Sequence, residues 1–182
     1  MKELSLNILD IAQNSIKAKA SLIDISIAET DEQMVISIKD NGCGMSKEML
    51  KNVSDPFCTT RTTRKVGLGI PFFRLAAEQT GGRLEISSIS ELDDSENHGT
   101  TTTAYLNKEH LDFTPLGDVI STICTLVQDC DDFDLVFTHN LPNGEKIQAD
   151  TRVFREILGD IPLGSPDVLV WLKGYLSEQY KK

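Results

Sequence analysis

The sequence predicts a fold of mixed α and β elements, because segments with helical and strand periodicity follow one another along its 182 residues. Residues 6–20 (LNILDIAQNSIKAKA) carry apolar residues at a helical spacing. Residues 22–28 (LIDISIA) and 34–39 (MVISIK) alternate instead, and the polar stretch ETDEQ between them is typical of a β-hairpin turn. A second helix and two further strands are predicted downstream, at residues 72–82, 83–89 and 98–106.

The first predicted helix has an unusual polar face. At about 100° per residue, this face collects Asn7, Asp10, Asn14 and Lys17. The opposite face is apolar, with Leu9, Ala12 and Ile16, and with Ile8 adjacent. Asn and Asp are poor helix formers, which favours a functional role over the alternative of a solvated stripe. An Asn oxygen suits Mg²⁺, and Lys17 could reach a phosphate.

The stretch DNGCGM, residues 40–45, follows the second strand of the predicted hairpin. A carboxylate fixed at a strand end, such as that of Asp40, can accept a hydrogen bond from an exocyclic amine like that of adenine. Gly42 and Gly44 lack Cβ, so the backbone there can take positive φ and let a flat ring approach closely. The alternative is an ordinary turn after a strand.

Residues 55–73 (DPFCTTRTTRKVGLGIPFF) are rich in hydroxyl groups and positive charge, although the protein is acidic. Gly67-Leu68-Gly69 then opens the second predicted helix. Glycines at a helix N-terminus expose backbone N–H groups, and the helix dipole favours an anion there. The stretch is therefore a candidate phosphate-binding segment, with a mobile basic loop as the alternative.

The order of these stretches resembles the ATP-binding domain of sensor histidine kinases. The resemblance extends from the Asn-bearing helix through DNGCGM, DPFCTTR, GLGI and QTGG to GTTTTAYL, over residues 3–107. This domain belongs to the GHKL superfamily (Bergerat fold), which includes DNA gyrase, Hsp90 and the mismatch-repair protein MutL. The resemblance implies an α/β (α+β) two-layer sandwich with a mixed sheet that binds ATP under a mobile lid.

The resemblance also implies roles for individual residues. It makes Asn14 the Mg²⁺ ligand, Asp40 the adenine reader and residues 57–66 the lid, and it puts Gly67 and Gly69 near the phosphates. The remaining nucleotide contacts are expected from the same stretches: Lys17, Gly42, Gly44, Met45, Phe57, Thr59, Thr60, Arg61, Leu68 and Thr100. The expected cofactors are ATP and Mg²⁺.

Asp10 departs from the pattern of the family. Histidine kinases usually carry Asn four residues before the metal-binding Asn, whereas the ATPases and the anti-sigma serine kinases carry Glu as a general base. Asp10 is an acid one methylene shorter, which makes it the candidate catalytic base. The alternative is that it only hydrogen-bonds ordered water near the metal.

A second departure concerns the phosphoacceptor. The three histidines, His98, His110 and His139, do not lie on a helix that precedes the domain. A self-phosphorylating sensor kinase is therefore not expected, and a kinase of this kind would need an acceptor in trans.

The resemblance ends near Lys108, so the sequence predicts an ATP-binding domain at residues 1–108 and a small α/β extension of unknown role at 109–182. The extension is expected to contain a helix at 118–129, two strands joined by an Asn143-Gly144 turn, and helices at 151–159 and 165–180. Ser165 is the expected N-cap of the last helix, with Pro166 at its first position. Its apolar stripe is interpreted as core, with a partner-binding face as the alternative: Val168, Trp171, Leu172 and Tyr175.

The composition of the chain argues against several kinds of binding partner and location. The formal net charge is −10, which argues against binding nucleic acid or an anionic membrane surface. No apolar run approaches the roughly 20 residues of a membrane span, and the N-terminus lacks a signal-peptide pattern, so a cytoplasmic location is expected. The resemblance implies one of two functions. One is a Mg²⁺-dependent ATPase or protein kinase acting on a partner. The other is a non-catalytic regulatory module whose lid conformation a partner protein reads.

Overall fold

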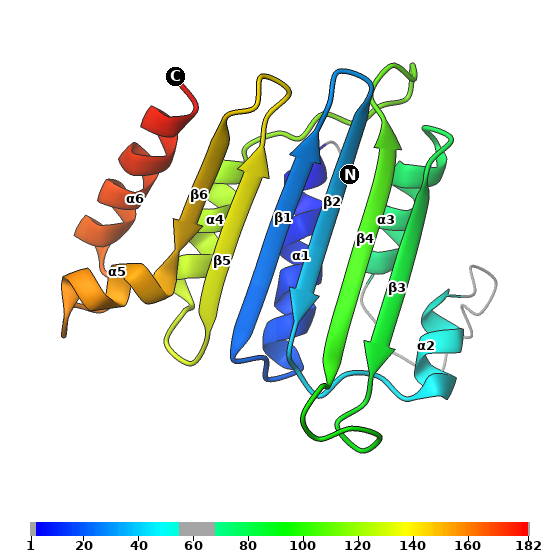
Figure 1. Cartoon of the computed structure of the whole chain (residues 1–182), viewed down its shortest axis with the longest axis horizontal. Helices are drawn as coiled ribbons and strands as arrows, with labels where there is room; N and C mark the ends of the chain where they lie inside the picture. Colours follow the sequence, from blue (N-terminus) through cyan, green and yellow to red (C-terminus); the bar gives the residue numbers. More distant parts are fainter. Residues whose placement is uncertain (1–2, 55–67, 182) are drawn as a thin grey trace.

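The computed structural model describes residues 3–181 except 55–67, and within these residues one six-stranded sheet organises the chain (Figure 1). No helix in this part of the chain is long and apolar enough to cross a membrane. The elements in chain order are α1 (Leu4–Lys17), β1 (Leu22–Glu29), β2 (Gln33–Asp40), α2 (Lys47–Ser54), α3 (Gly69–Glu78), β3 (Arg83–Ile89), β4 (Gly99–Asn107), α4 (Val119–Gln128), β5 (Asp134–Asn140), β6 (Lys146–Asp150), α5 (Thr151–Leu158) and α6 (Pro166–Gln179).

The strand order is β3-β4-β2-β1-β5-β6, and the sheet is mixed, as predicted. The β1–β5 pair is parallel, and the other neighbouring pairs are antiparallel. Helices α1, α3 and α4 lie along the same face of the sheet, which gives two layers (Figure 1). The α/β two-layer sandwich predicted from the sequence is confirmed.

Alternation along the central strands separates the two faces of the sheet. Ile23, Ile25 and Ile27 of β1 are fully buried, and the residues between them are not. On the other face, the hydroxyls of Ser37 and Thr103 from β2 and β4 lie 3.2 Å apart. The period of two seen in the sequence therefore gives one apolar face under the helices and one polar face.

Helix α1 is buried over a wider arc than its sequence suggested. Ile8 and Ala12 are buried as predicted, but Leu9 and Ile16, predicted on the same apolar face, are only half-buried. Ile11 and Ser15 are buried as well, because α1 contacts both α3 and α4. Asn7, expected on the open polar face, is only 1% exposed. Among the described residues, neither the nitrogen nor the oxygen of its side-chain amide has a hydrogen-bond partner.

Residues 109–182 continue the same sheet and the same core. Strand β5 pairs with β1, and the buried side chains of α4, β5 and α6 join one hydrophobic cluster with those of α1. The segment before α4 also binds the start of α1: Leu4 N–H donates to Pro115 O at 2.9 Å, and Ser5 N–H donates to Leu116 O at 2.8 Å.

A buried polar network fastens β5 to β1 and to the end of α6. His139 Nε2 lies 3.0 Å from Glu29 Oε1, and His139 Nδ1 lies 2.7 Å from Tyr180 Oη. Lys108 Nζ donates to Glu29 Oε2 at 2.8 Å. The hydrogen bond from His139, helped by that from Lys108, lowers the pKa of Glu29 against the opposing effect of burial.

Two predictions about α6 need correction. Ser165 is the N-cap and Pro166 follows it, but the Ser165 side chain accepts no capping hydrogen bond. The apolar stripe is also not all core, since Val168 and Leu172 are buried while Trp171 is 46% exposed. The Trp171 ring meets Phe154 of α5 edge to face and stacks on Tyr175 of α6, and the side chain still keeps this exposed area.

Candidate nucleotide site

Asp40 is the polar centre of the candidate site, at the end of β2. Its Oδ1 accepts hydrogen bonds from the N–H of Gly42 at 2.9 Å and of Thr100 at 3.2 Å, and its Oδ2 accepts from Ser15 Oγ at 2.6 Å. These three donors fix the orientation of the buried carboxylate. A carboxylate has about four acceptor positions, so capacity for one further donor, such as an amine, remains.

Ser15 was missed by the sequence analysis, although it links α1 to β2. Its hydroxyl is buried beside Asp40, whereas the preceding residue, Asn14, was identified from its place on the polar face of the helix. A small polar residue in mid-helix is a weak signal, because serine hydroxyls commonly bond their own helix backbone. Here Ser15 Oγ also lies 3.5 Å from Ile11 O.

The glycine loop after Asp40 is clamped between two elements. A Cβ on Gly42 would lie 2.8 Å from the Cβ and the O of Ala18, at the end of α1. Gly44 has φ +64°, and a Cβ there would lie 1.9 Å from Ile89 O, at the end of β3. The need for glycine at both positions is therefore explained by close approach of the protein's own backbone.

Thr100 and Met45 meet around a serine that the sequence analysis did not single out. The β2–β4 register pairs Thr100 with Asp40. Ser88 Oγ lies 2.8 Å from Thr100 Oγ1 and accepts a hydrogen bond from Met45 N–H at 2.8 Å. His98 Nδ1, also missed, lies 2.6 Å from Gly42 O. The structure thus brings the predicted residues of the adenine end together.

Asp10 meets the start of α3. A Cβ on Gly69 would lie 2.8 Å from the Cβ of Asp10, so the first residue of α3 packs directly against this side chain. In the part of the chain that the structure describes, the partly buried side chains of Asp10 and Asn14 form no hydrogen bond or ion pair. Lys17 and Leu68 are exposed. As far as the described residues go, the side chains of Asp10 and Asn14 are therefore free to meet a ligand.

Several predicted contacts lie outside the described residues: Phe57, Thr59, Thr60, Arg61 and Gly67. The lid at residues 57–66 and its phosphate contacts therefore stay predictions. No group of three or more His, Cys, Asp or Glu side chains among the described residues could hold a metal. A lone amide oxygen, that of Asn14, fits an ion such as Mg²⁺, which keeps several waters and shares its coordination with nucleotide phosphates.

Comparison with known proteins identifies the same region. Residues 2–110 match the family described as histidine kinase-, DNA gyrase B- and HSP90-like ATPase. Sporulation kinase C of Bacillus subtilis is 37% identical over 90 residues, covering 48% of this chain and 20% of that protein. The signal transduction histidine-protein kinase AtoS of Escherichia coli is 33% identical over 89 residues, covering 49% of this chain and 14% of that protein. The chain thus spans a fifth or less of these two relatives.

Solved structures share the fold. The Aquifex aeolicus MutL ATPase domain complexed with ADP aligns with a TM-score of 0.57 at 12% identity, covering 87% of this chain and 69% of that chain. The N-terminal domain of a DNA repair protein aligns with the same TM-score at 15% identity, covering 81% of this chain and 52% of that chain. Both alignments cover more than residues 2–110, so the likeness of fold extends into the C-terminal residues. This chain belongs to the family of histidine kinase-, DNA gyrase B- and HSP90-like ATPases and carries a histidine-kinase-type ATP-binding domain.

Proposed function

We propose that the protein is a Mg²⁺-dependent ATP-binding protein of the cytoplasm that hydrolyses ATP slowly or phosphorylates a partner protein in trans. The hydrogen bond from Ser15 Oγ to Asp40 carries this proposal, because it fixes α1 to the proposed adenine reader. The adjacent residue, Asn14, and Asp10 one turn before it then stand at a set position relative to a bound nucleotide.

Each end of the nucleotide has a proposed set of contacts. Asp40 takes the adenine amine through its remaining acceptor capacity, with Gly42, Gly44, Met45 and Thr100 around it. Asn14 supplies an oxygen ligand to Mg²⁺, and Lys17 and the N-terminal end of α3 at Leu68 and Gly69 face the phosphates. The proposed lid, residues 57–66, adds the contacts of Phe57, Thr59, Thr60, Arg61 and Gly67.

Asp10 is the proposed general base. It has no hydrogen-bond partner among the described residues and lies against the start of α3, where the phosphates are proposed to sit. A carboxylate there can orient or deprotonate a water or a hydroxyl nucleophile, which is typically worth about 10²–10⁴-fold in rate.

The histidines of the chain support a phosphoacceptor in trans. His139 is buried and bonded on both ring nitrogens, and His98 is bonded to the glycine loop. His110 is exposed but lies in the connection after β4, where its Nδ1 accepts a hydrogen bond from Asp112 N–H at 3.1 Å.

A non-catalytic regulatory role is the second candidate, favoured by the way α1 is held. The start of α1 hydrogen-bonds to Pro115 and Leu116, and Thr122 Oγ1 of α4 donates to Ser5 O at 3.4 Å. Any shift of α1 on nucleotide binding would therefore be passed to the C-terminal residues, where a partner protein could read it.

Calorimetric titration with ADP and Mg²⁺ tests nucleotide binding first. We expect saturable heat that weakens when Mg²⁺ is removed, and an absence of heat at millimolar nucleotide would contradict both candidates. Incubation with labelled ATP then tests catalysis. Release of phosphate, or label on a partner from cell extract, supports the enzyme, whereas stable label on the isolated protein would contradict the acceptor in trans.

A further inference from the structure

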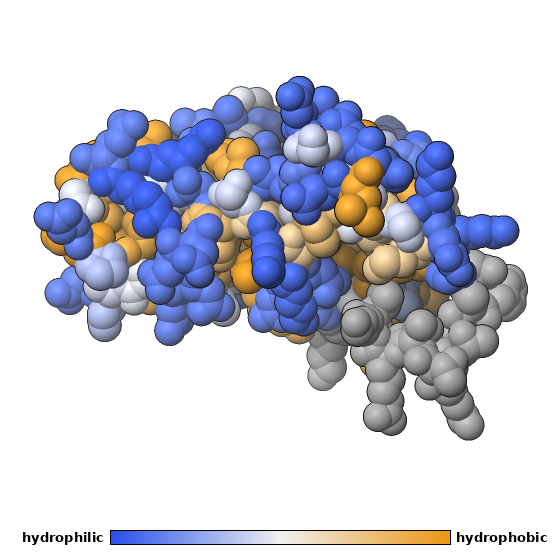
Figure 2. Space-filling view, turned by 90° about the horizontal axis from the view of Figure 1, so that it is seen from below, coloured by the Kyte–Doolittle hydropathy of each residue, from blue (hydrophilic) through white to orange (hydrophobic). Residues whose placement is uncertain are grey.

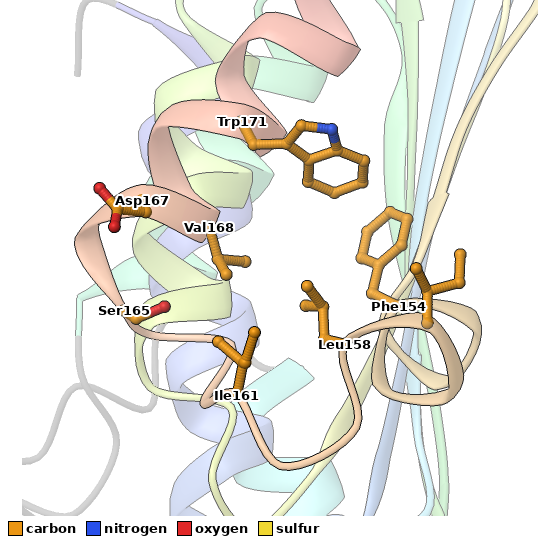
Figure 3. A pocket seen from close by; sticks show the side chains of 8 residues that line it. Phe154, Leu158, Ile161, Ser165, Asp167, Val168 and Trp171 are labelled. Carbon is orange, nitrogen blue, oxygen red and sulfur yellow. The ribbon is translucent and has the colours of Figure 1, made fainter.

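An apolar groove lies between α5 and α6, at the edge of the molecule far from α2 and β3 (Figure 1). Its volume is about 520 Å³, within the range of binding pockets. Figure 3 shows side chains from α5, from the connection and from α6 arranged around an open space. The apolar residues that line it are Phe154, Ile157, Leu158, Ile161, Val168 and Trp171.

The groove leaves large apolar side chains in water. Ile157 is 73% exposed, Ile161 is 53% exposed and Trp171 is 46% exposed. Figure 2 shows hydrophobic residues at this end of the molecule, set among hydrophilic ones. Single exposed apolar residues are ordinary, but a set of them around a hollow is a candidate interaction site.

Two aromatic side chains, Phe154 and Trp171, form part of the groove wall. The rings of Trp171 and Phe154 meet edge to face with centroids 5.3 Å apart, and Trp171 stacks on Tyr175 at 5.2 Å. The residue that follows Trp171 in α6, Leu172, is fully buried in the core. Aromatic side chains held in place in this way are the typical anchors of protein interfaces, since little conformational entropy is lost on binding.

The charged residues around the groove favour a positively charged partner. Asp167 lines the groove, and Glu156 and Asp160 directly precede the lining residues Ile157 and Ile161 in the sequence. Among the described residues, these three carboxylates have no ion-pair partner. The two arginines of α5 are already engaged in ion pairs, because Arg152 lies 2.7 Å from Asp150 and Arg155 lies 3.0 Å from Asp134. A ligand with positive groups around an apolar centre fits this arrangement. A second copy of this chain, whose net charge is −10, does not.

We propose that this groove binds an amphipathic helix of a partner protein, with apolar residues at spacings of three and four facing the groove and Lys or Arg beside them. Ser165 lies among the lining residues at one end of the groove. Its side-chain oxygen is buried and has no partner among the described residues, and Figure 3 shows it turned toward the open space. The proposal goes beyond nucleotide binding and does not depend on it.

Trp171 is the only tryptophan of the chain and reports directly on the groove. The probe is a synthetic peptide of Leu and Lys, about five helical turns long, with Leu at amphipathic spacing. We expect a saturable blue shift of Trp171 fluorescence, with a Kd in the micromolar range, without nucleotide present. A peptide of the same composition in scrambled order should bind at least tenfold more weakly. A peptide in which Glu replaces every Lys should also bind at least tenfold more weakly at low salt. This difference in affinity should become smaller as the salt concentration rises.

Two matched variants separate the groove from general surface attraction. Ile157 and Val170 are 73% and 74% exposed, but only Ile157 lines the groove. Ile157→Asn should lower the affinity for the peptide at least tenfold, whereas Val170→Asn should change this affinity less than twofold. Thermal unfolding checks that both variants are folded. Equal losses, an absence of saturable binding, or a Trp171 shift that follows self-association of the protein alone would each overturn the proposal. Loss of nucleotide binding would leave this measurement unaffected.

Discussion

The two sides of strand β1 bury polar groups in different ways. Toward β2 and β4, the Asp40 carboxylate receives three hydrogen bonds and keeps acceptor capacity to spare, beside glycines that allow close approach. Toward β5, His139 bonds to Glu29 and to Tyr180, and Lys108 takes the second oxygen of Glu29. A buried polar group with spare capacity indicates a ligand site, whereas a network whose members satisfy one another indicates a structural joint.

Breaking the joint should give the largest effect. His139→Ala leaves Glu29 and Tyr180 without their buried partner and opens a cavity, so we expect a loss of about 3 kcal/mol or more in the free energy of unfolding. ADP affinity should change less than twofold in the folded variant. Urea unfolding and calorimetry measure the two quantities, with exposed His110→Ala as the control expected to change neither. A large loss of ADP affinity would show that the joint also serves the nucleotide site.

The next effect concerns the proposed base at the other side. Asp10→Asn keeps the shape of the side chain and removes the base, so turnover should fall at least a hundredfold, about 2.7 kcal/mol in the barrier. Nucleotide affinity should stay within about tenfold. Phosphate release and calorimetry test this together. A variant that keeps its rate excludes Asp10 as the base, and a wild type without turnover, with or without cell extract, favours the regulatory role.

Asp40→Asn tests the adenine end. Loss of a hydrogen bond to a charged group should weaken ADP by about 1.5–3 kcal/mol. Ser15→Ala removes only a hydroxyl that orients the carboxylate, so it should cost less, about 1 kcal/mol. Calorimetric titration of both variants, with urea unfolding as the check on folding, measures the difference. Unchanged affinity in Asp40→Asn would remove this residue from the adenine pocket.

Much of the nucleotide side was predictable because its signals are local. Alternation along residues 22–28 and 34–39 predicts the β1–β2 hairpin, which the structure confirms. The glycines after Asp40 were expected to take positive φ and to let a flat ring approach. The structure shows positive φ at Gly44 but not at Gly42, and at both positions the atoms that approach closely belong to the protein itself. Ser15 was missed because its contact with Asp40 joins residues 25 positions apart, and nothing within the helix itself announces the pairing.

The C-terminal side depended on long-range pairing that the sequence does not show. The helices and strands of residues 109–182 were predicted from periodicity, but the parallel pairing of β5 with β1 was not. Trp171 fits a helical apolar stripe equally well when buried or exposed. Its exposure depends on how much of α6 is covered by α5. The periodicity of one helix carries no information about how a second helix packs on it.

Asn7 combines a confirmed prediction with a wrong one. It lies on a helix, as its sequence period predicted, but its burial against neighbouring elements was not predicted. A buried amide without hydrogen bonds costs free energy, so Asn7→Leu, of similar size, should stabilise the protein by about 1 kcal/mol. Urea unfolding measures this gain, and ADP affinity should stay within twofold. A loss of ADP affinity instead would assign Asn7 to the nucleotide site.

The smallest expected effect is a change in the pH dependence of stability at the joint. The bond from His139, together with that from Lys108, lowers the pKa of Glu29 below its usual 4.5. The unfolded state therefore takes up a proton at higher pH than the folded state. The stability that Glu29 contributes is present above pH 4.5 and is lost as pH falls through the lower, folded pKa. Glu29→Gln should be less stable than the wild type at neutral pH, and the difference should shrink as the solution is acidified.

Other carboxyl groups with lowered pKa, such as those of Asp94 and Asp150, titrate alike in both proteins and cancel in the difference. Urea unfolding of both proteins across the acid range measures it. A difference that stays constant with pH would show that Glu29 acts through packing and not through its charge.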